Sequence, residues 1–429
     1  MIARHLGQIV LVRGAIPGER VRAWIERAEK RMAYAVTREV IEPSPDRRSA
    51  GPEGPTENDP LCGGALYSHI AYPRQLAIKS DVLRDAFGRL GRYPIDHPID
   101  VAGSPEEGYR MRAMLHVHGA RAGFYREGTH RLCDAAATKQ LRGETVAAVE
   151  RLALCLHREA PGAVVSITIT ENIAGDERAA HLELAPGARL TDEALARAGS
   201  EAQLSGISMQ DPAALEPRAI GHPAVSDPLS ALTNDRVTDG TLGRHAASFF
   251  QGNRFLLPSL ILAVADAAPD TGEVVDLYAG VGLFSVVLAA LGRLEVTAVE
   301  GDRASGADLR ENARPHAPRL EAHVTSVEAY LAARAGGRAA GKGGRARRPA
   351  TLLLDPPRTG LSREAAESIV RLAPERVVYV SCDPPTLARD TRRLLDAGYS
   401  LDFVRAFDFF PNTPHVETLA TLSRSPANP

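Results

Sequence analysis

The sequence has few cysteines, no long apolar run and almost no net charge. Its 429 residues include four cysteines, no charged-then-apolar leader and no apolar stretch long enough to cross a bilayer. These absences argue against a secreted or membrane protein, and we expect a protein of the reducing cytoplasm with no membrane partner. Because 51 basic residues face 53 acidic ones, any surface that binds nucleic acid must be local.

The composition is otherwise that of a globular protein with two or three domains: 44% of the residues are hydrophobic and 24% are charged. The first forty or so residues alternate apolar and polar positions around a Pro-Gly turn, which predicts a small antiparallel β module. Eight basic residues against four acidic ones in residues 1–40 fit an RNA-binding face and a solvated barrel surface equally well. Residues 43–60 are rich in Pro, Gly and Ser and are predicted to be a linker.

Two further domains are predicted after this linker. Residues 61–240 mix short strands with helices, which indicates a central α+β domain. Residues 241–429 repeat the order strand, glycine turn, helix and strand, which is typical of right-handed βαβ units in a mostly parallel sheet. Residues 334–348 interrupt this order with Gly, Ala and basic residues, and we interpret them as a mobile surface insertion rather than an RNA contact.

The first turn of the C-terminal domain indicates a nucleotide site. Gly280-Val281-Gly282 follows a strand and opens a helix, and Glu300 ends the next strand. Glycines let the backbone approach a ligand, and the carboxylate accepts hydrogen bonds from ribose hydroxyls. Because NAD sites share this pattern, a dehydrogenase is one alternative. S-adenosylmethionine has no pyrophosphate and needs no third glycine, and Ser285 takes that place here.

Two strand ends in the same domain carry reactive side chains. An apolar run delivers Cys382 to the end of a strand, and another delivers Asp355, with prolines following each. Side chains at the carboxyl ends of strands in an open α/β sheet face the crevice where such folds bind ligands. A lone strand-end cysteine is more often an inert core residue, so the argument depends on the two residues acting together.

A thiol and a carboxylate beside S-adenosylmethionine suit one class of substrate. C5 of a pyrimidine is a poor nucleophile, but a thiolate that adds to C6 creates an enolate whose C5 accepts a methyl group. A base must then remove the C5 proton so that the thiolate leaves. Under this hypothesis Cys382 is the nucleophile and Glu417 is the base. Because a thiol is mostly protonated at neutral pH, we expect Arg358 or His415 to supply an activating positive charge.

Together these motifs resemble the RNA uridine-5 methyltransferases, which make 5-methyluridine in transfer RNA and large-subunit ribosomal RNA. The resemblance covers nearly the whole chain and is most specific in Ser381-Cys382-Asp383-Pro384 and Pro414-His415-Val416-Glu417. Weaker matches are Tyr109 through Arg112, Gly123-Phe124-Tyr125-Arg126 and Phe249-Phe250-Gln251-Gly252-Asn253.

The resemblance implies a fold and a set of site residues. It implies an α/β Rossmann-like class I methyltransferase domain over residues 241–429, a TRAM-type, OB-like RNA-binding barrel over residues 1–46 and an α+β RNA-binding domain over residues 61–240. We expect a cytoplasmic monomer that acts on ribosomal or transfer RNA and not on DNA. The resemblance assigns Cys382 as nucleophile and Glu417 as base. The expected contacts of S-adenosylmethionine are Gln251, Tyr278, Gly280, Glu300 and Asp355.

The sequence departs from many ribosomal-RNA members at their [4Fe-4S] site, which needs four cysteines. Cys62 and Cys133 match two of the positions, but Ala65 takes a third and no cysteine precedes Cys62. A cluster and any other metal are therefore not expected. Cys155 lies in a helical pattern and is predicted to be a core residue.

A uridine inside paired RNA hides its C5, so the enzyme must take a loop uridine or flip one out. Candidate RNA contacts are Arg110, Arg112, Phe124 and Arg126, although each also fits a structural role. Two alternatives to the methyltransferase stay open at this point. A nicotinamide oxidoreductase would use the glycine turn but leave Cys382 without a role, and a non-catalytic RNA-binding protein would need no nucleophile. The sequence does not say which RNA is bound.

Overall fold

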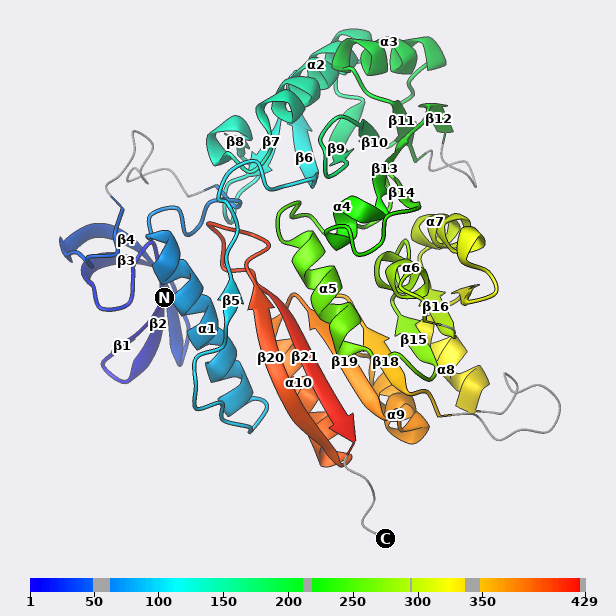
Figure 1. Cartoon of the computed structure of the whole chain (residues 1–429). Coiled ribbons are helices and arrows are strands. Elements are labelled where there is room, and N and C mark those ends of the chain that lie inside the picture. Colours follow the sequence, from blue (N-terminus) through cyan, green and yellow to red (C-terminus); the bar gives the residue numbers. More distant parts are fainter. Residues whose placement is uncertain (49–61, 211–217, 294, 336–347, 425–429) are drawn as a thin grey trace.

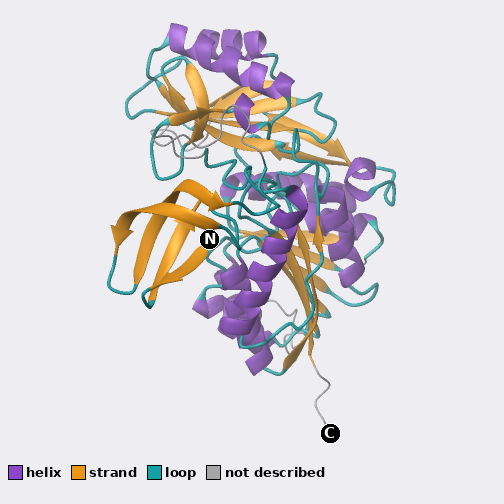
Figure 2. Ribbon diagram, turned by 90° about the vertical axis from the view of Figure 1, so that its left-hand side faces the viewer, coloured by secondary structure: helices purple, strands orange, loops and turns teal. Residues whose placement is uncertain are grey.

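The structure is a computed structural model that describes residues 1–48, 62–210, 218–293, 295–335 and 348–424. These residues form three large sheets and one two-stranded sheet. In Figures 1 and 2 the N-terminal sheet stands to one side, the central sheet lies above and the C-terminal sheet lies below between layers of helices. In the described ranges, no helix combines the length and the hydropathy that a membrane span needs. Most of the predicted insertion at 334–348 and of the predicted linker at 43–60 lies outside the described residues.

The N-terminal sheet has four strands, and β1 was not predicted. In spatial order they are β1 (Ile2–His5), β2 (Gln8–Arg13), β4 (Met32–Glu42) and β3 (Arg20–Ala28). The expectation of a purely antiparallel module is wrong, because β2 pairs with β4 in parallel. Three register shifts between β3 and β4 bend this pair, as bulges do. The inner face holds a small apolar core that includes Val10, Val12 and Ala35.

The central sheet has helices on one face. Its strands are, in spatial order, β12 (Arg218–Gly221), β11 (Gly206–Met209), β10 (Arg178–Leu184), β9 (Val164–Glu171), β6 (Arg112–His118), β7 (Arg121–Tyr125) and β8 (Leu132–Asp134). Helices α2 (Gly143–Glu159) and α3 (Asp192–Ala202) pack on it through one apolar core. Cys155 is fully buried in that core, as predicted.

The C-terminal sheet has eight strands. In spatial order they are β17 (Leu320–Val324), β16 (Val296–Glu300), β15 (Val274–Leu277), β18 (Thr351–Leu354), β19 (Arg376–Ser381), β21 (Glu417–Arg424), β20 (Tyr399–Phe407) and β5 (Val101–Ala102). The first five are parallel, and β21 is antiparallel to β19 and to β20. The strand order reverses between β15 and β18, which is where open α/β sheets bind ligands.

Both faces of this sheet are covered by helices, which explains why its inner strands are apolar throughout. One apolar core contains residues of α5 (Leu257–Ala267), α6 (Leu283–Ala290) and α7 (Arg303–Ala313). The core on the other face contains residues of α1 (Tyr72–Arg89), α8 (Val327–Ala335), α9 (Arg363–Leu372) and α10 (Pro384–Asp396).

Some segments lie elsewhere than the predicted domain boundaries imply. Helix α1 and strand β5, expected in the central domain, join the C-terminal sheet, where β5 pairs with β20. Strand β13 (Ala224–Pro228) leads into α4 (Leu229–Thr233) and pairs with β14 (Thr241–His245), across the expected boundary at residue 240. Periodicity identifies such elements in a sequence, but it carries no information on which sheet they join.

Helix α1 holds the loop that connects β20 with β21. Buried Lys79 donates to the buried carboxylate of Asp408 and, at 3.2 Å, to the carbonyl oxygen of Phe410. Four residues earlier on the helix, Gln75 donates to Asn412 Oδ1 and accepts from its backbone N–H, both at 2.9 Å. In Figure 1 this loop lies at the upper edge of the C-terminal sheet, beside the start of α1. The N-terminal half of the chain therefore fixes a loop of the C-terminal half.

Replacing the buried cation of this pair should destabilise the fold. Lys79→Met leaves the Asp408 carboxylate buried without its partner, which typically costs about 3–5 kcal/mol. We expect a clearly lower midpoint of thermal unfolding, and Lys79→Met/Asp408→Asn should recover much of the loss. Arg363→Met serves as control, because its ion pair with Glu367 is exposed and such pairs contribute about 0–1 kcal/mol. Equal midpoints for Lys79→Met and Arg363→Met would contradict this account.

Candidate active site

Three strand ends of the C-terminal sheet bring the predicted catalytic residues together. Asp355 follows β18 and Cys382 follows β19, and these strands are parallel neighbours. Strand β21 runs antiparallel to β19 with Thr418 opposite Ser381. Glu417, the first residue of β21, therefore lies at the same end of the sheet as Cys382. In Figure 1 this end is the upper edge of the lower sheet, which faces the central sheet.

The turn after β15 has the backbone geometry of a ligand cradle. Tyr278, Gly280 and Gly282 have φ values of 63°, 58° and 92°. A Cβ atom on Gly280 would meet no atom within 4 Å, so the backbone there is open to a ligand. Glu300 accepts hydrogen bonds from the backbone N–H groups of Gly280, at 2.8 Å, and Asp302, at 2.6 Å. A carboxylate has further lone pairs, so Glu300 can also accept from ribose hydroxyls.

Gln251 links the segment before α5 to this edge of the sheet. Its side chain is buried, and Nε2 donates to Asp355 Oδ2 at 3.2 Å. The backbone of the same segment is fixed next to the central sheet, because Gly252 accepts from Met111 N at 2.8 Å. Four of the five residues expected to contact the cofactor thus lie in the turns and strand ends of one edge, and Gln251 reaches it through its hydrogen bond to Asp355.

Buried carboxylates dominate the electrostatics of this edge. Burial raises the pKa of Asp355 to about 7, and the negative charge of Glu300 adds to the shift. Burial also holds the pKa of Glu417 well above its usual range, and Asp355 adds to it. Asp276, fully buried on β15, has its pKa raised by burial to about 8. Asp276 was not predicted as a site residue, although a lone acid inside an apolar strand was a visible signal.

Carboxyl groups outnumber cations at this edge of the sheet, which suits a positively charged ligand. Asp276, Glu300, Asp355 and Glu417 are carboxylates, and Arg358 is the cation whose charge opposes the raised pKa of Glu417. S-adenosylmethionine carries a sulfonium and an ammonium group, and positive charge favours the ionised form of a buried carboxylate. The residues present therefore suit this cofactor.

Of the two cations expected to activate Cys382, only Arg358 lowers the pKa of its thiol. Burial and the charge of Glu417 raise its pKa to about 11, and Arg358 only partly opposes them. The expectation that His415 adds a positive charge is wrong. Burial and the charge of Arg358 lower the pKa of His415 to about 4, so its ring is neutral at neutral pH.

The other cysteines lie away from this edge. Cys62 and Cys133 form a disulfide between the start of the described central segment and β8, a bond that was not predicted from the sequence. Over the part of the chain that the structure describes, no group of three or more His, Cys, Asp or Glu side chains is arranged to hold a metal ion.

The candidate RNA contacts are only partly brought together. The guanidinium of Arg110 lies 5.6 Å from the ring centres of both Phe124 and Phe410, and Phe410 belongs to the β20–β21 loop. Arg112 lies beside Phe249, at 5.8 Å from its ring centre. Arg126 instead pairs through its backbone with Cys62.

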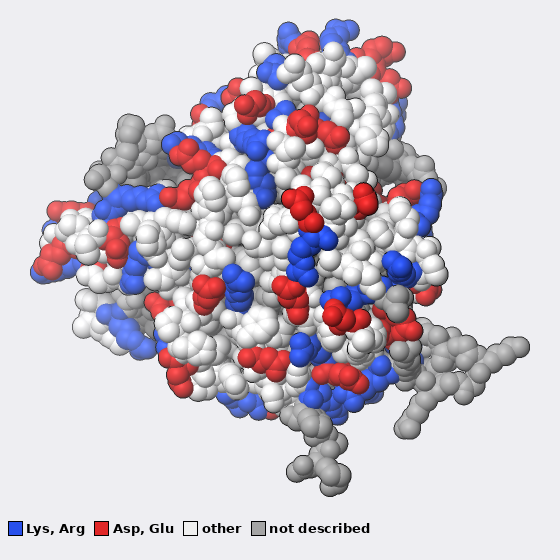
Figure 3. Space-filling view, in the orientation of Figure 1, with Lys and Arg blue, Asp and Glu red and all other residues white. Residues whose placement is uncertain are grey.

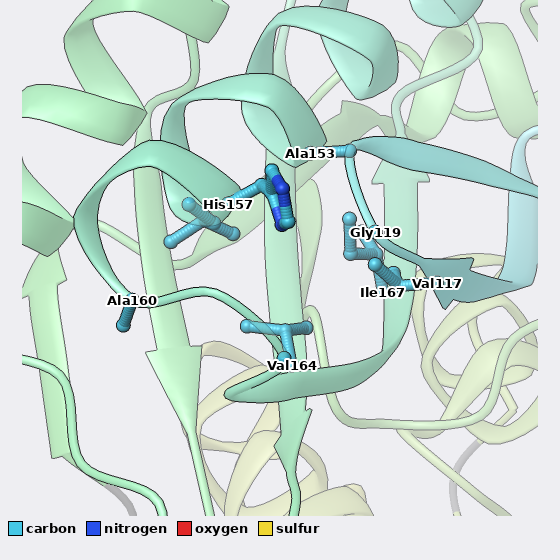
Figure 4. A pocket seen from close by; sticks show the side chains of 9 residues that line it. Val117, Gly119, Ala153, His157, Ala160, Val164 and Ile167 are labelled. Carbon is cyan, nitrogen blue, oxygen red and sulfur yellow. The ribbon is translucent and has the colours of Figure 1, made fainter.

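A small pocket of the central domain is separate from this edge. Figure 4 shows it between α2 and strands β6 and β9, with His157 among apolar residues such as Val117, Val164 and Ile167. None of the predicted site residues lines it.

Comparison with known proteins identifies the class to which this fold and site belong. Residues 241–425 match the family described as tRNA (Uracil-5-)-methyltransferase. The chain is 31% identical over 437 residues to 23S rRNA (uracil(1939)-C(5))-methyltransferase RlmD of Aeromonas hydrophila, covering 99% of this chain and 93% of that protein. It is 32% identical over 443 residues to RlmD of Alkalilimnicola ehrlichii, with the same coverage.

A solved structure shows the same fold. The tRNA (uracil-54, C5)-methyltransferase of Pyrococcus abyssi, in complex with S-adenosyl-L-homocysteine, superposes with a TM-score of 0.72 at 23% identity. The superposition covers 97% of this chain and 96% of that one. The chain therefore belongs to the family of S-adenosylmethionine-dependent RNA uracil-C5 methyltransferases. The predicted family and fold class are confirmed, and the oxidoreductase and the non-catalytic RNA-binding protein are set aside.

The raised pKa of Asp355 predicts that the ligand-free protein becomes less stable as the pH rises. Its carboxyl stays protonated up to about pH 7 when folded, but ionises near pH 4 when unfolded. Stability therefore falls as pH rises from about 4 to 7. Asp355→Asn cannot ionise, so its unfolding midpoint should fall less than that of the wild type between pH 5 and 8, by roughly 2 °C or more.

Two measurements accompany this comparison of unfolding midpoints. The exposed Asp239→Asn serves as control and should follow the wild type at every pH. Asp355→Asn should also bind S-adenosylmethionine more weakly in calorimetry, because a carboxylate near the cation is lost. A pH dependence identical to that of the wild type would show that Asp355 ionises normally in the fold.

Proposed function

We propose that Cys382 and Glu417 carry out the methylation of a uridine at C5, Cys382 as nucleophile and Glu417 as base. One observation supports this assignment more than any other. The antiparallel register of β19 and β21 sets Thr418 opposite Ser381, which brings the thiol and the buried carboxylate to one end of two neighbouring strands. Asp355 follows the next strand on the other side of β19.

The proposed reaction divides one difficult step into easier ones. The Cys382 thiolate forms a bond with C6 of the uracil, and the electrons of the C5–C6 double bond move towards O4. When bound, S-adenosylmethionine supplies the methyl group that C5 accepts. Glu417 then takes the remaining proton from C5. The electrons of that C–H bond restore the double bond, and the C6–S bond breaks to release the thiolate.

The charges at this edge must change before the thiol can react. With a pKa near 11, Cys382 is protonated at neutral pH, and burial holds the pKa of Glu417 well above its usual range. A nearby positive charge lowers the pKa of a thiol and of a carboxyl group alike. Arg358, which follows Asp355 in the same loop, is the cation of this chain that favours the thiolate. The Cys382 thiol then loses its proton to solvent and can add to C6, and Glu417 in its ionised form can accept the C5 proton.

The proposed substrate is folded RNA, and ribosomal RNA is favoured over transfer RNA. The relatives with 31% and 32% identity over nearly the whole chain are named for uracil 1939 of 23S rRNA. We further propose that the protein acts as a cytoplasmic monomer with no DNA or membrane partner, and that the sheets of residues 1–46 and 61–240 hold the RNA over the catalytic edge.

The two catalytic assignments predict different failures. Cys382→Ala should reduce methyl transfer to background, because no C6 adduct forms. Glu417→Gln keeps the shape of the side chain but cannot take the C5 proton, so methylated RNA should stay bonded to the protein through a denaturing gel. Cys382→Ala/Glu417→Gln is the control and should show no such band. Normal turnover by Glu417→Gln would mean that another group is the base.

The identity of the RNA is tested in cells that lack the protein. We expect one 5-methyluridine of large-subunit ribosomal RNA to revert to uridine, and restoring the wild type should return it, whereas Cys382→Ala should not. Mapping modified nucleotides in ribosomal and transfer RNA measures this directly. Loss of a transfer-RNA methyl group instead would refute the preference for ribosomal RNA while leaving the chemistry intact.

A further inference from the structure

Two arginines lie next to the cofactor edge on a segment of the central sheet. Residues 109–112 run alongside the Gln251 segment: Met111 N donates to Gly252 O at 2.8 Å, and Arg254 N donates to Tyr109 O at 3.0 Å. Arg110 forms a backbone bridge with Asn253. This antiparallel pairing sets the segment of Arg110 and Arg112 beside Gln251, which donates to Asp355.

These two guanidinium groups lack the carboxylate partners that neighbouring arginines have. Arg110 donates to Gln140 Oε1 at 2.7 Å and to Arg112 O at 3.0 Å, and Arg112 donates to Ser248 O at 3.0 Å. Within the described ranges, neither forms an ion pair. By contrast, buried Arg244 pairs with Asp227, and buried Arg254 pairs with Glu171.

The missing carboxylate partners are reflected in the pKa values of the two arginines. Burial and the charges of Arg110 and Arg244 lower the pKa of Arg112 to about 10. Burial also lowers the pKa of Arg110. Two half-buried positive charges without an anion between them are unfavourable, because each has lost water and repels the other. An anion that binds to both would remove this unfavourable free energy. On the face that Figure 3 shows, basic and acidic side chains are interspersed, so positive charge is not spread as a broad patch there.

The surroundings of the two arginines point to a nucleic-acid ligand. Arg110 lies between Phe124 of the central sheet and Phe410 of the loop that precedes Glu417. Arg112 lies beside Phe249, whose side chain is 62% exposed. Cations held among aromatic rings at the rim of a catalytic edge are typical of sites that hold the backbone of an unpaired strand.

We propose that Arg110 and Arg112 form a phosphate-binding site for the RNA backbone next to the target uridine. Guanidinium groups present several N–H donors in one plane and pair with phosphate oxygens through charge-assisted hydrogen bonds. Such contacts position a nucleic acid without reading its sequence. The site rests on the proposed function for its location, because it binds the substrate of the same reaction.

The test measures RNA binding separately from chemistry. Arg110→Gln and Arg112→Gln are made both alone and on the Cys382→Ala background, which binds RNA without reacting. The probe is the RNA fraction, ribosomal or transfer, that the wild type methylates. Each substitution should weaken RNA binding about 10-fold at moderate salt and reduce the slope of log affinity against log salt by about 0.7–0.9. At saturating RNA, kcat should stay within a few-fold of the wild type, so the loss appears in KM.

Controls separate this role from a structural one and from a free-phosphate site. Arg112→Lys should keep most of the salt slope. Arg197→Gln should match the parent, because Arg197 of α3 already pairs with Glu159 of α2. The affinity for S-adenosylmethionine should not change, because a change would mean that the arginines merely shape the Gln251 segment. Displacement of RNA by millimolar inorganic phosphate at constant ionic strength, lost in Arg112→Gln, would show that the site takes free phosphate and would overturn the proposal.

Two failures remain distinguishable. An unchanged salt slope and an unchanged KM in both arginine variants overturn the phosphate site, even if the wild type methylates RNA normally. Absence of methyl transfer by the wild type, with tight RNA binding that still depends on Arg112, overturns the proposed reaction and leaves the phosphate site in place.

Discussion

The burial of several carboxyl groups at one edge of the C-terminal sheet is the constraint on which the site depends, because burial raises the pKa of each of them. Asp355 and Glu417 share this edge, where the charge of Asp355 adds to the effect of burial on the pKa of Glu417 and the charge of Glu300 adds to that on Asp355. Asp276 on β15 is buried too, and the charges of Asp355 and Glu300 add to the effect of burial on its pKa. Apolar cores on both faces of the sheet hold these side chains away from water. The fold thus stores an electrostatic cost that a cationic ligand relieves, which couples ligand binding to the charge state of the base.

The catalytic loop is fixed by parts of the chain that are distant in sequence. Lys79 and Gln75 of α1 hold Asp408 and Asn412. From another direction, buried Asn253 donates to Phe409 O at 3.1 Å and accepts from the first backbone N–H groups before α5. The position of the base therefore depends on the N-terminal half of the chain.

Much of the site followed from strand ends alone. Cys382 and Asp355 were predicted because the carboxyl ends of parallel strands line one crevice of the sheet. The strands that precede these residues, β18 and β19, are parallel neighbours. Glu417 required chemistry and a family resemblance, since it starts an antiparallel strand and its register is a tertiary property. The same reason explains why residues 61–240 were expected to form one central domain, although α1 and β5 join the C-terminal sheet. The neutral state of His415 was missed because it results from burial and from Arg358, neither of which a sequence pattern shows.

The central claim is that Cys382 bonds to C6 and Glu417 removes a proton from C5. RNA in which 5-fluorouridine replaces uridine tests both parts at once, because a carboxylate cannot remove fluorine as it removes a proton. Incubation of the wild type with this RNA and S-adenosylmethionine, followed by denaturation, digestion and mass spectrometry, should give a Cys382 peptide bonded to a methylated nucleotide. Normal methylation of ordinary RNA, without any adduct on Cys382 from the fluorinated RNA, would contradict the account.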